Sequence, residues 1–207
     1  MKNVIKRIVD IVISLCALFF GLPIFIITAI AIKLDSEGPV FYFQDRVGKD
    51  ENLFKFWKFR SMVVNADEIL FKNKEMYNQM RSGAHKVKND PRITKVGKFI
   101  RRTSIDELPQ FWNILKGDMS FVGPRAYRPD EIKIYREEKR EGYILFPEVF
   151  SVKPGLTGAW QVSGRSTLTF LQRVEMDAYY AKNWSLLDDL IIILKTPFAV
   201  IQGNGAY

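Results

Sequence analysis

The sequence predicts an α+β protein, mostly helical, in which an N-terminal membrane segment precedes one compact domain with short strands. Three observations predict this class. An uncharged apolar run fills residues 11–32 and is interrupted by Pro23. The rest of the 207-residue chain is long enough for one ordinary soluble domain. Within that domain, helical patterns outnumber two short strand-like patterns. We therefore divide the chain into a membrane-anchoring segment, residues 1–35, and a domain, residues 36–207.

The apolar run is long enough to cross a membrane, but Pro23 predicts a break in it. A helix rises ~1.5 Å per residue, so a run of this length matches the ~30 Å hydrocarbon core of a bilayer. Proline lacks a backbone donor, and its ring clashes with the carbonyl of Phe19. Basic residues flank both ends, as they do on cytoplasmic sides of membrane segments. Length and charge alone leave a single span and a re-entrant hairpin equally open. A cleaved signal peptide is disfavoured, because Lys33 follows the run at once.

Composition restricts the chemistry that the domain can carry. The net charge of +8 favours anionic partners such as phosphates, anionic lipids or nucleic acid. The single cysteine, Cys16, lies in the apolar run, and the single histidine is His85. An intramolecular disulfide is therefore excluded, and neither a Ser-His-Asp triad nor a multi-histidine zinc site is supported. Carboxylates and basic side chains must carry any catalysis.

The domain begins with a turn at residues 35–39, after which two strands are predicted. Residues 40–44 form a short strand pattern. Residues 54–60 alternate aromatic and basic side chains, including Lys58 and Arg60, which predicts a half-buried strand with a basic face. Such a stripe can also stack on nucleic-acid bases, but the same aromatics suit a lipid interface.

Helices are predicted over three later segments, 66–80, 131–141 and 168–182. The chain between the first two is polar and very basic over residues 81–102. Residues 131–141 mix both signs of charge densely, which predicts a solvated helix with little functional content. Residues 186–201 are apolar but interrupted by charges and a proline, so they suit a core or interfacial helix better than a second span.

The stretch from Arg101 to Gln110 carries the strongest chemical pattern. Its simplest interpretation is a helix start, because Ser104 and Glu107 fit a capping box. Pro109 argues against that start. Proline is free of cost only in the first turn, so a regular helix is expected to begin near Asp106 instead.

Asp106 and Glu107 would then lie at a helix N-terminus, where free amides and the dipole favour anions. Arg101 and Arg102 can make bidentate contacts with phosphate oxygens. Adjacent carboxylates with phosphate ligands are also a natural arrangement for Mg²⁺. A carboxylate can act as a nucleophile that forms an acyl phosphate. The pattern therefore indicates phosphate chemistry.

Two glycine-punctuated loops also have a functional pattern. Residues 117–125 end in Arg125, and residues 153–165 contain Gln161 and Arg165. Glycine allows positive φ and a close approach of the backbone to a ligand. Neither loop is a Walker or Rossmann fingerprint, and each taken singly is more often a structural turn.

Together, these segments resemble one family, the bacterial sugar transferases that are monotopic phosphoglycosyl transferases. The resemblance runs essentially from end to end and rests on several blocks in the same order. These blocks are Asp35 to Pro39; Lys58-Phe59-Arg60-Ser61-Met62; Asp106-Glu107-Leu108-Pro109-Gln110; Ser120-Phe121-Val122-Gly123-Pro124-Arg125; and Lys153-Pro154-Gly155-Leu156-Thr157-Gly158 with Gly164-Arg165.

The resemblance implies transfer of a sugar 1-phosphate from a UDP-sugar to undecaprenyl phosphate, with release of UMP and a need for Mg²⁺. This would be the first membrane step of a surface glycan pathway, on the cytoplasmic face of the bacterial inner membrane. The aspartate matching Asp106 is the nucleophile that forms a covalent phosphosugar intermediate. The glutamate matching Glu107 is its partner near the metal. Basic residues before this dyad contact phosphate, which points to Arg101 or Arg102.

The resemblance also implies that the apolar segment is re-entrant, broken at a proline, with both ends cytoplasmic. Two departures stand out: Leu22-Pro23 replaces the frequent Ser-Pro at the break, and Ala126-Tyr127 follows Arg125 where a proline is common. We expect a hairpin, phosphate contacts from Arg125, and substrate contacts from Lys58, Arg60, Gln161 and Arg165. Membrane lipid is an expected partner, nucleic acid is not, and a homodimer is left open.

The chief alternative is a membrane-anchored, non-catalytic binder of anionic lipid or nucleic acid that uses the basic segment 81–102. Net charge would explain its binding. Asp106 and Glu107 would then have no role, because carboxylates repel a polyanion.

Overall fold

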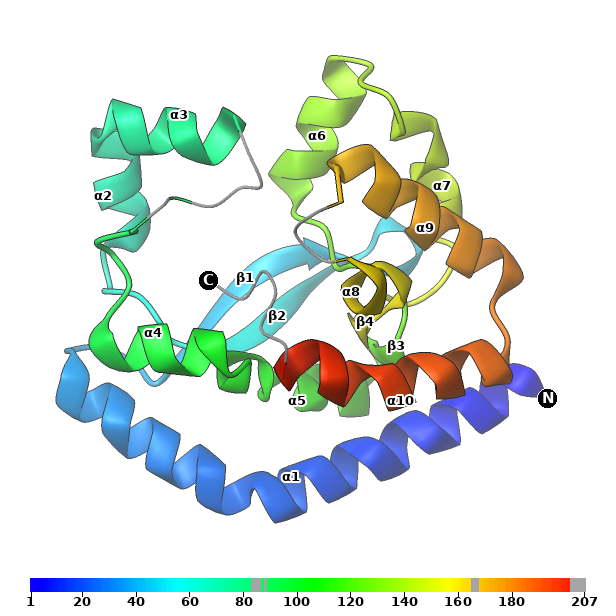
Figure 1. Ribbon diagram of the computed structural model, residues 1–207, viewed down its shortest axis with the longest axis horizontal. Helices are drawn as coiled ribbons and strands as arrows, with labels where there is room; N and C mark the ends of the chain where they lie inside the picture. Colours follow the sequence, from blue (N-terminus) through cyan, green and yellow to red (C-terminus); the bar gives the residue numbers. More distant parts are fainter. Residues whose placement is uncertain (83–86, 88, 165–167, 202–207) are drawn as a thin grey trace.

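The computed structural model describes residues 1–82, 87, 89–164 and 168–201 (Figure 1). Most of the described chain is helical, with a few short strands and one long apolar N-terminal helix, as the sequence predicts. The elements in chain order are α1 (Lys2–Asp35), β1 (Phe41–Val47), η1 (Lys49–Glu51), β2 (Leu53–Phe59), α2 (Ala66–Lys72), α3 (Lys74–Ser82), α4 (Lys95–Arg102), η2 (Ile105–Glu107), α5 (Gln110–Lys116), β3 (Ser120–Val122), α6 (Pro129–Glu137), η3 (Tyr143–Leu145), α7 (Phe146–Val149), β4 (Gly155–Thr157), α8 (Ala159–Ser163), α9 (Phe170–Asn183) and α10 (Leu186–Ile201).

The two predicted strands are confirmed and form an antiparallel hairpin, β1–β2. Its register pairs Phe41 with Phe59 at the open end and Val47 with Leu53 at the turn. The second sheet is a parallel pair, β3–β4. Buried side chains fill the space around both sheets, including Phe59 against α1 and α4, and Tyr127 among α7 and α9. The hairpin therefore contributes to two core clusters, with Phe59 at its open end in one and Val47 at its turn in the other.

Three predicted elements need correction. The helix over 66–80 is divided into α2 and α3 at Asn73, whose side-chain oxygen accepts a hydrogen bond from the Met76 N–H (3.1 Å) and starts the second helix. The helix over 131–141 is α6, and its first turn is buried at Glu131 and Ile132 rather than solvated. The two glycine-rich loops contain β3, β4 and α8.

The glycines of those loops serve strand packing. A Cβ atom built on Gly155 would lie 2.1 Å from the backbone nitrogen of Gly123, and one on Gly123 would lie 2.5 Å from the carbonyl oxygen of Lys153. The β3 and β4 backbones can approach this closely only without side chains at these positions. The glycine pattern here is thus explained by strand packing, without a ligand.

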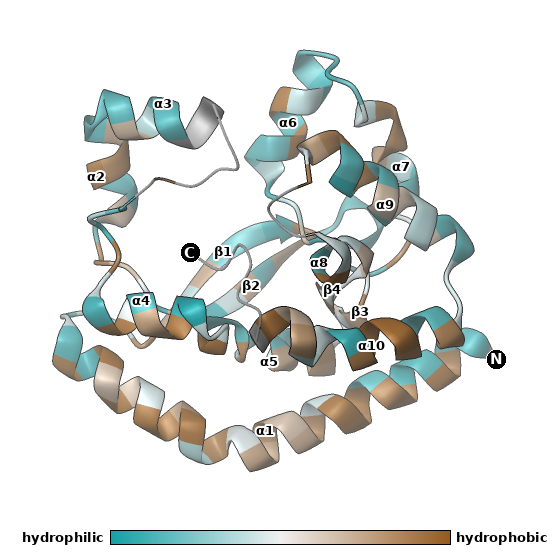
Figure 2. Cartoon of the chain, viewed as in Figure 1, coloured by the Kyte–Doolittle hydropathy of each residue, from teal (hydrophilic) through white to brown (hydrophobic). Residues whose placement is uncertain are grey.

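Helix α1 is continuous, with Pro23 inside it, and is bowed so that its middle lies farthest from the domain (Figure 1). It is the one described helix whose length and composition could cross a membrane. Figure 2 shows its apolar middle, where Phe19 and Phe20 are 74% and 75% exposed. The helix continues through Pro23, where the sequence predicts a break. The re-entrant path through a membrane stays a prediction.

Both ends of α1 are bonded to the same domain. Near its start, the Arg7 guanidinium donates to the carbonyl oxygens of Ile114 (2.5 Å) and Leu115 (2.7 Å). At its end, the Asp35 carboxylate accepts from the Val96 N–H (2.9 Å). Arg7, one of the basic residues before the apolar run, is therefore bound to the domain.

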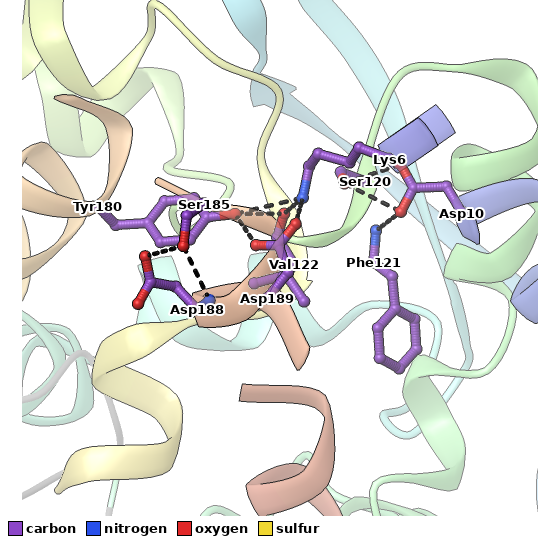
Figure 3. A network of polar contacts seen from close by, with 9 residues as sticks. All are labelled: Lys6, Asp10, Ser120, Phe121, Val122, Tyr180, Ser185, Asp188 and Asp189. Carbon is purple, nitrogen blue, oxygen red and sulfur yellow. Dashed lines mark hydrogen bonds and ion pairs between the residues drawn. The ribbon is translucent and has the colours of Figure 1, made fainter. Parts of the chain in front are cut away.

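A buried polar network joins the first turns of α1 to β3 and α10 (Figure 3). Asp10 accepts hydrogen bonds from the Ser120 hydroxyl (2.8 Å) and the Phe121 N–H (2.8 Å). Lys6 donates to the Val122 carbonyl (2.9 Å) and pairs with Asp189 on α10 (2.5 Å). These two α1 side chains satisfy the edge of β3 that β4 leaves open.

Asp10→Ala is therefore expected to destabilise the whole domain, although Asp10 precedes the apolar run. Two buried donors, the Ser120 hydroxyl and the Phe121 N–H, would lose their acceptor, which costs about 2–4 kcal/mol of unfolding free energy. Thermal unfolding in detergent measures this loss. Asp45→Ala, which removes an exposed ion pair with Lys55, is the control and should cost about 0–1 kcal/mol. Equal losses in the two variants would contradict the role of the network.

Candidate active site

Asp106 and Glu107 lie in a single 3₁₀ turn, η2, between α4 and α5. Ser104 precedes this turn in the left-handed conformation (φ 57°), and Pro109 is the N-cap residue of α5. The expected regular helix therefore begins at Gln110 rather than near Asp106, and the carboxylates lie before it. The capping box is not formed either, because the Ser104 side chain makes no capping bond. Asp106 is buried, with 7% of its surface exposed, and Glu107 is half-buried.

The ammonium group of Lys58 is placed against both carboxylates. Its Nζ lies 2.6 Å from Oε1 of Glu107 and 3.6 Å from Oδ2 of Asp106. Lys58 reaches them from β2, whose backbone packs against η2 and α5. The Asn113 side chain on α5 fixes this contact, since it accepts from the Trp57 N–H (3.1 Å) and donates to the Lys55 carbonyl (2.7 Å). The structure thus brings the strand lysine and the dyad together.

The two carboxyl groups have different proton affinities. Burial raises the pKa of Asp106, against the opposing charge of Lys58, and the neighbouring Glu107 raises it further. Burial also works to raise the pKa of Glu107, but the charge and hydrogen bond of Lys58 outweigh it, so this pKa is lowered. Neighbouring carboxyl groups whose pKa values are pushed apart are typical of catalytic pairs.

Of the two arginines before the dyad, Arg101 is the one whose charge acts on it, because it lowers the pKa of Asp106. Arg102 is exposed on the last turn of α4. Arg101 therefore acts on the dyad through its charge.

Arg125 enters the same region from the end of β3. Its charge lowers the pKa of Glu107, and its Nη2 lies 3.9 Å from Oε1 of Glu131. Its guanidinium carbon lies 5.8 Å from the centre of the Trp160 ring on α8. A third of the Arg125 side chain is exposed, which leaves it accessible to an anion beside the dyad.

The backbone of Arg125 is held by a residue that the sequence patterns did not reveal. Asp177 on α9 accepts from the Arg125 N–H (3.1 Å) and the Tyr127 hydroxyl (2.8 Å). Burial raises the pKa of Asp177 to about 7, although both of these hydrogen bonds lower it. Tyr127 is fully buried in the core cluster that contains Phe146 and Val174. An aspartate inside a helical pattern gave no signal of this contact.

Of the remaining predicted site residues, the structure describes Arg60 and Gln161. Arg60 is buried, and its guanidinium binds the Ser36 hydroxyl (2.6 Å) and the Pro39 carbonyl (2.5 Å), so it fixes the turn after α1. Gln161 lies on α8 and donates to the Leu156 carbonyl (3.4 Å). Arg165 lies outside the described residues.

The donor set of the dyad fits Mg²⁺ together with a phosphate ligand. In the described part of the chain, no group of three or more His, Cys, Asp or Glu side chains could hold a metal ion. Mg²⁺ commonly uses only one or two carboxylates and takes its other ligands from substrate phosphates and water. Asp106 and Glu107 supply those two carboxylates, and Lys58 already shows that they attract a cation.

The whole chain matches known proteins. A family model described as bacterial sugar transferase matches residues 1–203. The chain is 44% identical over 206 residues to an undecaprenyl-phosphate galactose phosphotransferase of Salmonella typhimurium, with 98% of this chain and 42% of that protein covered. It is 41% identical over 212 residues to a UDP-glucose:undecaprenyl-phosphate glucose-1-phosphate transferase of Escherichia coli, covering 100% and 42%. It is also 41% identical over 206 residues to the exopolysaccharide production protein ExoY of Sinorhizobium fredii, covering 98% and 88%. The chain thus spans less than half the length of the first two proteins.

Proposed function

Because this chain belongs to the bacterial sugar transferase family, we propose that it transfers a sugar 1-phosphate from a UDP-sugar to undecaprenyl phosphate and releases UMP. The observation that carries this proposal is the carboxylate dyad of buried Asp106 and half-buried Glu107, which is paired with Lys58 and affected by the charges of Arg101 and Arg125. The first residue of the dyad can attack phosphorus, and the basic groups can hold phosphoryl oxygens.

The reaction has two displacements at one phosphorus atom. In the first, an Asp106 carboxylate oxygen attacks the phosphorus bonded to the sugar, and the bond to the bridging oxygen of UMP breaks. In the second, a phosphate oxygen of undecaprenyl phosphate attacks the same phosphorus, and the acyl phosphate bond breaks. The products are undecaprenyl-diphosphate-sugar and the free Asp106 carboxylate. Two displacements of this kind give ping-pong kinetics.

The chain's own residues have distinct roles in these steps. Lys58 holds Asp106 and Glu107 in place and keeps Glu107 ionised. Arg101 and Arg125 offset the charge that develops on the transferring phosphoryl group. Asp106 and Glu107 would hold Mg²⁺. When it is bound, this ion would neutralise part of the negative charge on the phosphates.

We further propose that α1 enters the cytoplasmic leaflet of the bacterial inner membrane and returns. Its two ends are bonded to one domain, while Phe19 and Phe20 in its middle are exposed. A straight span would separate its ends by the thickness of a bilayer. The domain would then lie at the headgroup level, where the phosphate of the lipid acceptor is found.

Release of UMP from a panel of UDP-sugars tests this function. We expect release by the full chain in vesicles that contain undecaprenyl phosphate and Mg²⁺, and we expect little turnover when the lipid acceptor is omitted. Absence of UMP release with every sugar of the panel would contradict the proposal. Binding of anionic vesicles or nucleic acid without turnover would instead support the non-catalytic alternative.

A further inference from the structure

A second basic residue of the hairpin, Arg46, lies on the same face of the sheet as Lys58. The register pairs Tyr42 with Lys58 and Arg46 with Phe54, and directly paired side chains of an antiparallel ladder share a face. Side chains alternate along a strand, so Tyr42 and Arg46 also share a face. One face of β1–β2 therefore presents both cations.

The two cations contact the two halves of the site. Lys58 pairs with the dyad on η2. Arg46 donates from Nη1 to the carbonyl oxygen of Ala126 (3.0 Å), the residue that follows Arg125. The hairpin is thus a common support that fixes the Arg125 loop relative to the carboxylates.

Arg46 is held rigidly and is almost completely buried, with 8% of its surface exposed. Its guanidinium carbon lies 5.2 Å from the centre of the Phe56 ring. The Gln44 amide oxygen, in the orientation that pairs donor with acceptor, accepts from Nε and Nη2 of Arg46. Together with the bond to Ala126, these contacts leave the side chain little freedom.

No carboxylate of the described residues forms an ion pair with Arg46, although the charges of Glu131 and Glu107 act on it. Among the residues that the structure describes, no carboxylate oxygen lies within 4.0 Å of its guanidinium nitrogens. Burial and the charge of Arg125 lower its pKa and the charge of Glu131 raises it; the resulting pKa of about 10 keeps the group charged at neutral pH. A buried cation beside another cation is costly unless an anion completes the site. A bound diphosphate would supply that anion.

We propose that Arg46 is a positioning residue of the phosphate site: it fixes the Arg125 loop to the hairpin face that carries Lys58, and its buried charge strengthens the binding of the donor's phosphates. This inference rests on the proposed function. Its effect is specific to the phosphate part of a ligand, because Arg46 acts through Arg125 and through charge. Binding of the nucleoside part of the donor should therefore not depend on Arg46.

Binding of UDP and of uridine to the full chain in lipid nanodiscs separates these parts. Ligand-observed NMR measures both affinities, including the weak one of uridine. Arg46→Met should weaken UDP binding by about tenfold or more and leave uridine binding unchanged, because the Arg125 loop loses its support on the hairpin and the phosphate site loses a buried positive charge. Arg46→Lys keeps the charge but not the fork that reaches both Gln44 and Ala126, so an intermediate loss is expected. Arg136→Met removes an exposed arginine paired with Glu51 on the surface and should change neither affinity.

The outcomes distinguish this inference from the function on which it rests. If the wild-type chain binds UDP and turns over, but UDP binding by both Arg46 variants equals that of the wild type, the inference alone is wrong. Equal weakening of UDP and uridine would also overturn it, since that result indicates general damage to the fold. A wild-type chain that binds neither ligand would overturn the proposed function together with this inference.

Discussion

Asp106→Asn is expected to reduce the rate of UMP release by about 10⁴-fold or more, because an amide of nearly the same shape cannot attack phosphorus. The variant should fold as well as the wild type or better. Burial raises the pKa of Asp106, so its charged form is disfavoured by the folded state, and an uncharged amide removes that cost.

Kinetics and thermal unfolding of the same preparations check both parts of this expectation. Asp45→Asn, an exposed aspartate on β1, is the matched control and should keep its activity. A large loss of stability in Asp106→Asn would leave the loss of activity without a chemical explanation. Turnover at close to the wild-type rate would show that Asp106 is not the attacking group.

Lys58→Met is expected to have the second largest effect, a loss of about 10²–10³-fold in kcat/KM at neutral pH. The charge of Lys58 lowers the pKa values of both Asp106 and Glu107, so its removal raises both. The attacking carboxylate would then be ionised only at higher pH. The acid limb of the pH–rate profile should move to higher pH, and part of the lost rate should return as pH rises.

The pH dependence of kcat/KM for the wild type and the variant measures this shift. Lys55→Met is the matched control, because Lys55 lies on the same strand in an exposed ion pair with Asp45. Its profile should coincide with that of the wild type. A uniform reduction in Lys58→Met with an unmoved acid limb would show that Lys58 does not set the ionisation of the dyad.

The regular patterns of the sequence predicted the regular elements. Alternation over 54–60 identified β2, and the apolar run identified α1. Pro109 correctly argued against a helix start at Ser104, but it did not reveal that the dyad occupies a separate 3₁₀ turn. That turn depends on the left-handed conformation of Ser104. No sequence pattern predicts that a serine adopts the left-handed conformation.

Contacts between distant segments could not be predicted in the same way. Arg60 and Lys58 are two positions apart, so the strand pattern places them on one face, yet only Lys58 reaches the dyad. Asp10 and Asp177 act through hydrogen bonds to β3 and to the loop that follows it, more than 50 positions away along the chain. Each of them binds a backbone N–H group, which every residue type except proline provides, so no residue pattern in the sequence marks that contact.

The central claim is that Asp106 carries the sugar phosphate as a covalent intermediate. Intact-protein mass spectrometry of the full chain after incubation with a UDP-sugar and Mg²⁺, without undecaprenyl phosphate, tests this claim most directly. The account predicts a mass increase equal to one sugar phosphate, located on the peptide that contains Asp106 and absent from Asp106→Asn. An adduct that persists in Asp106→Asn, or a wild-type chain that turns over without any adduct, would contradict it.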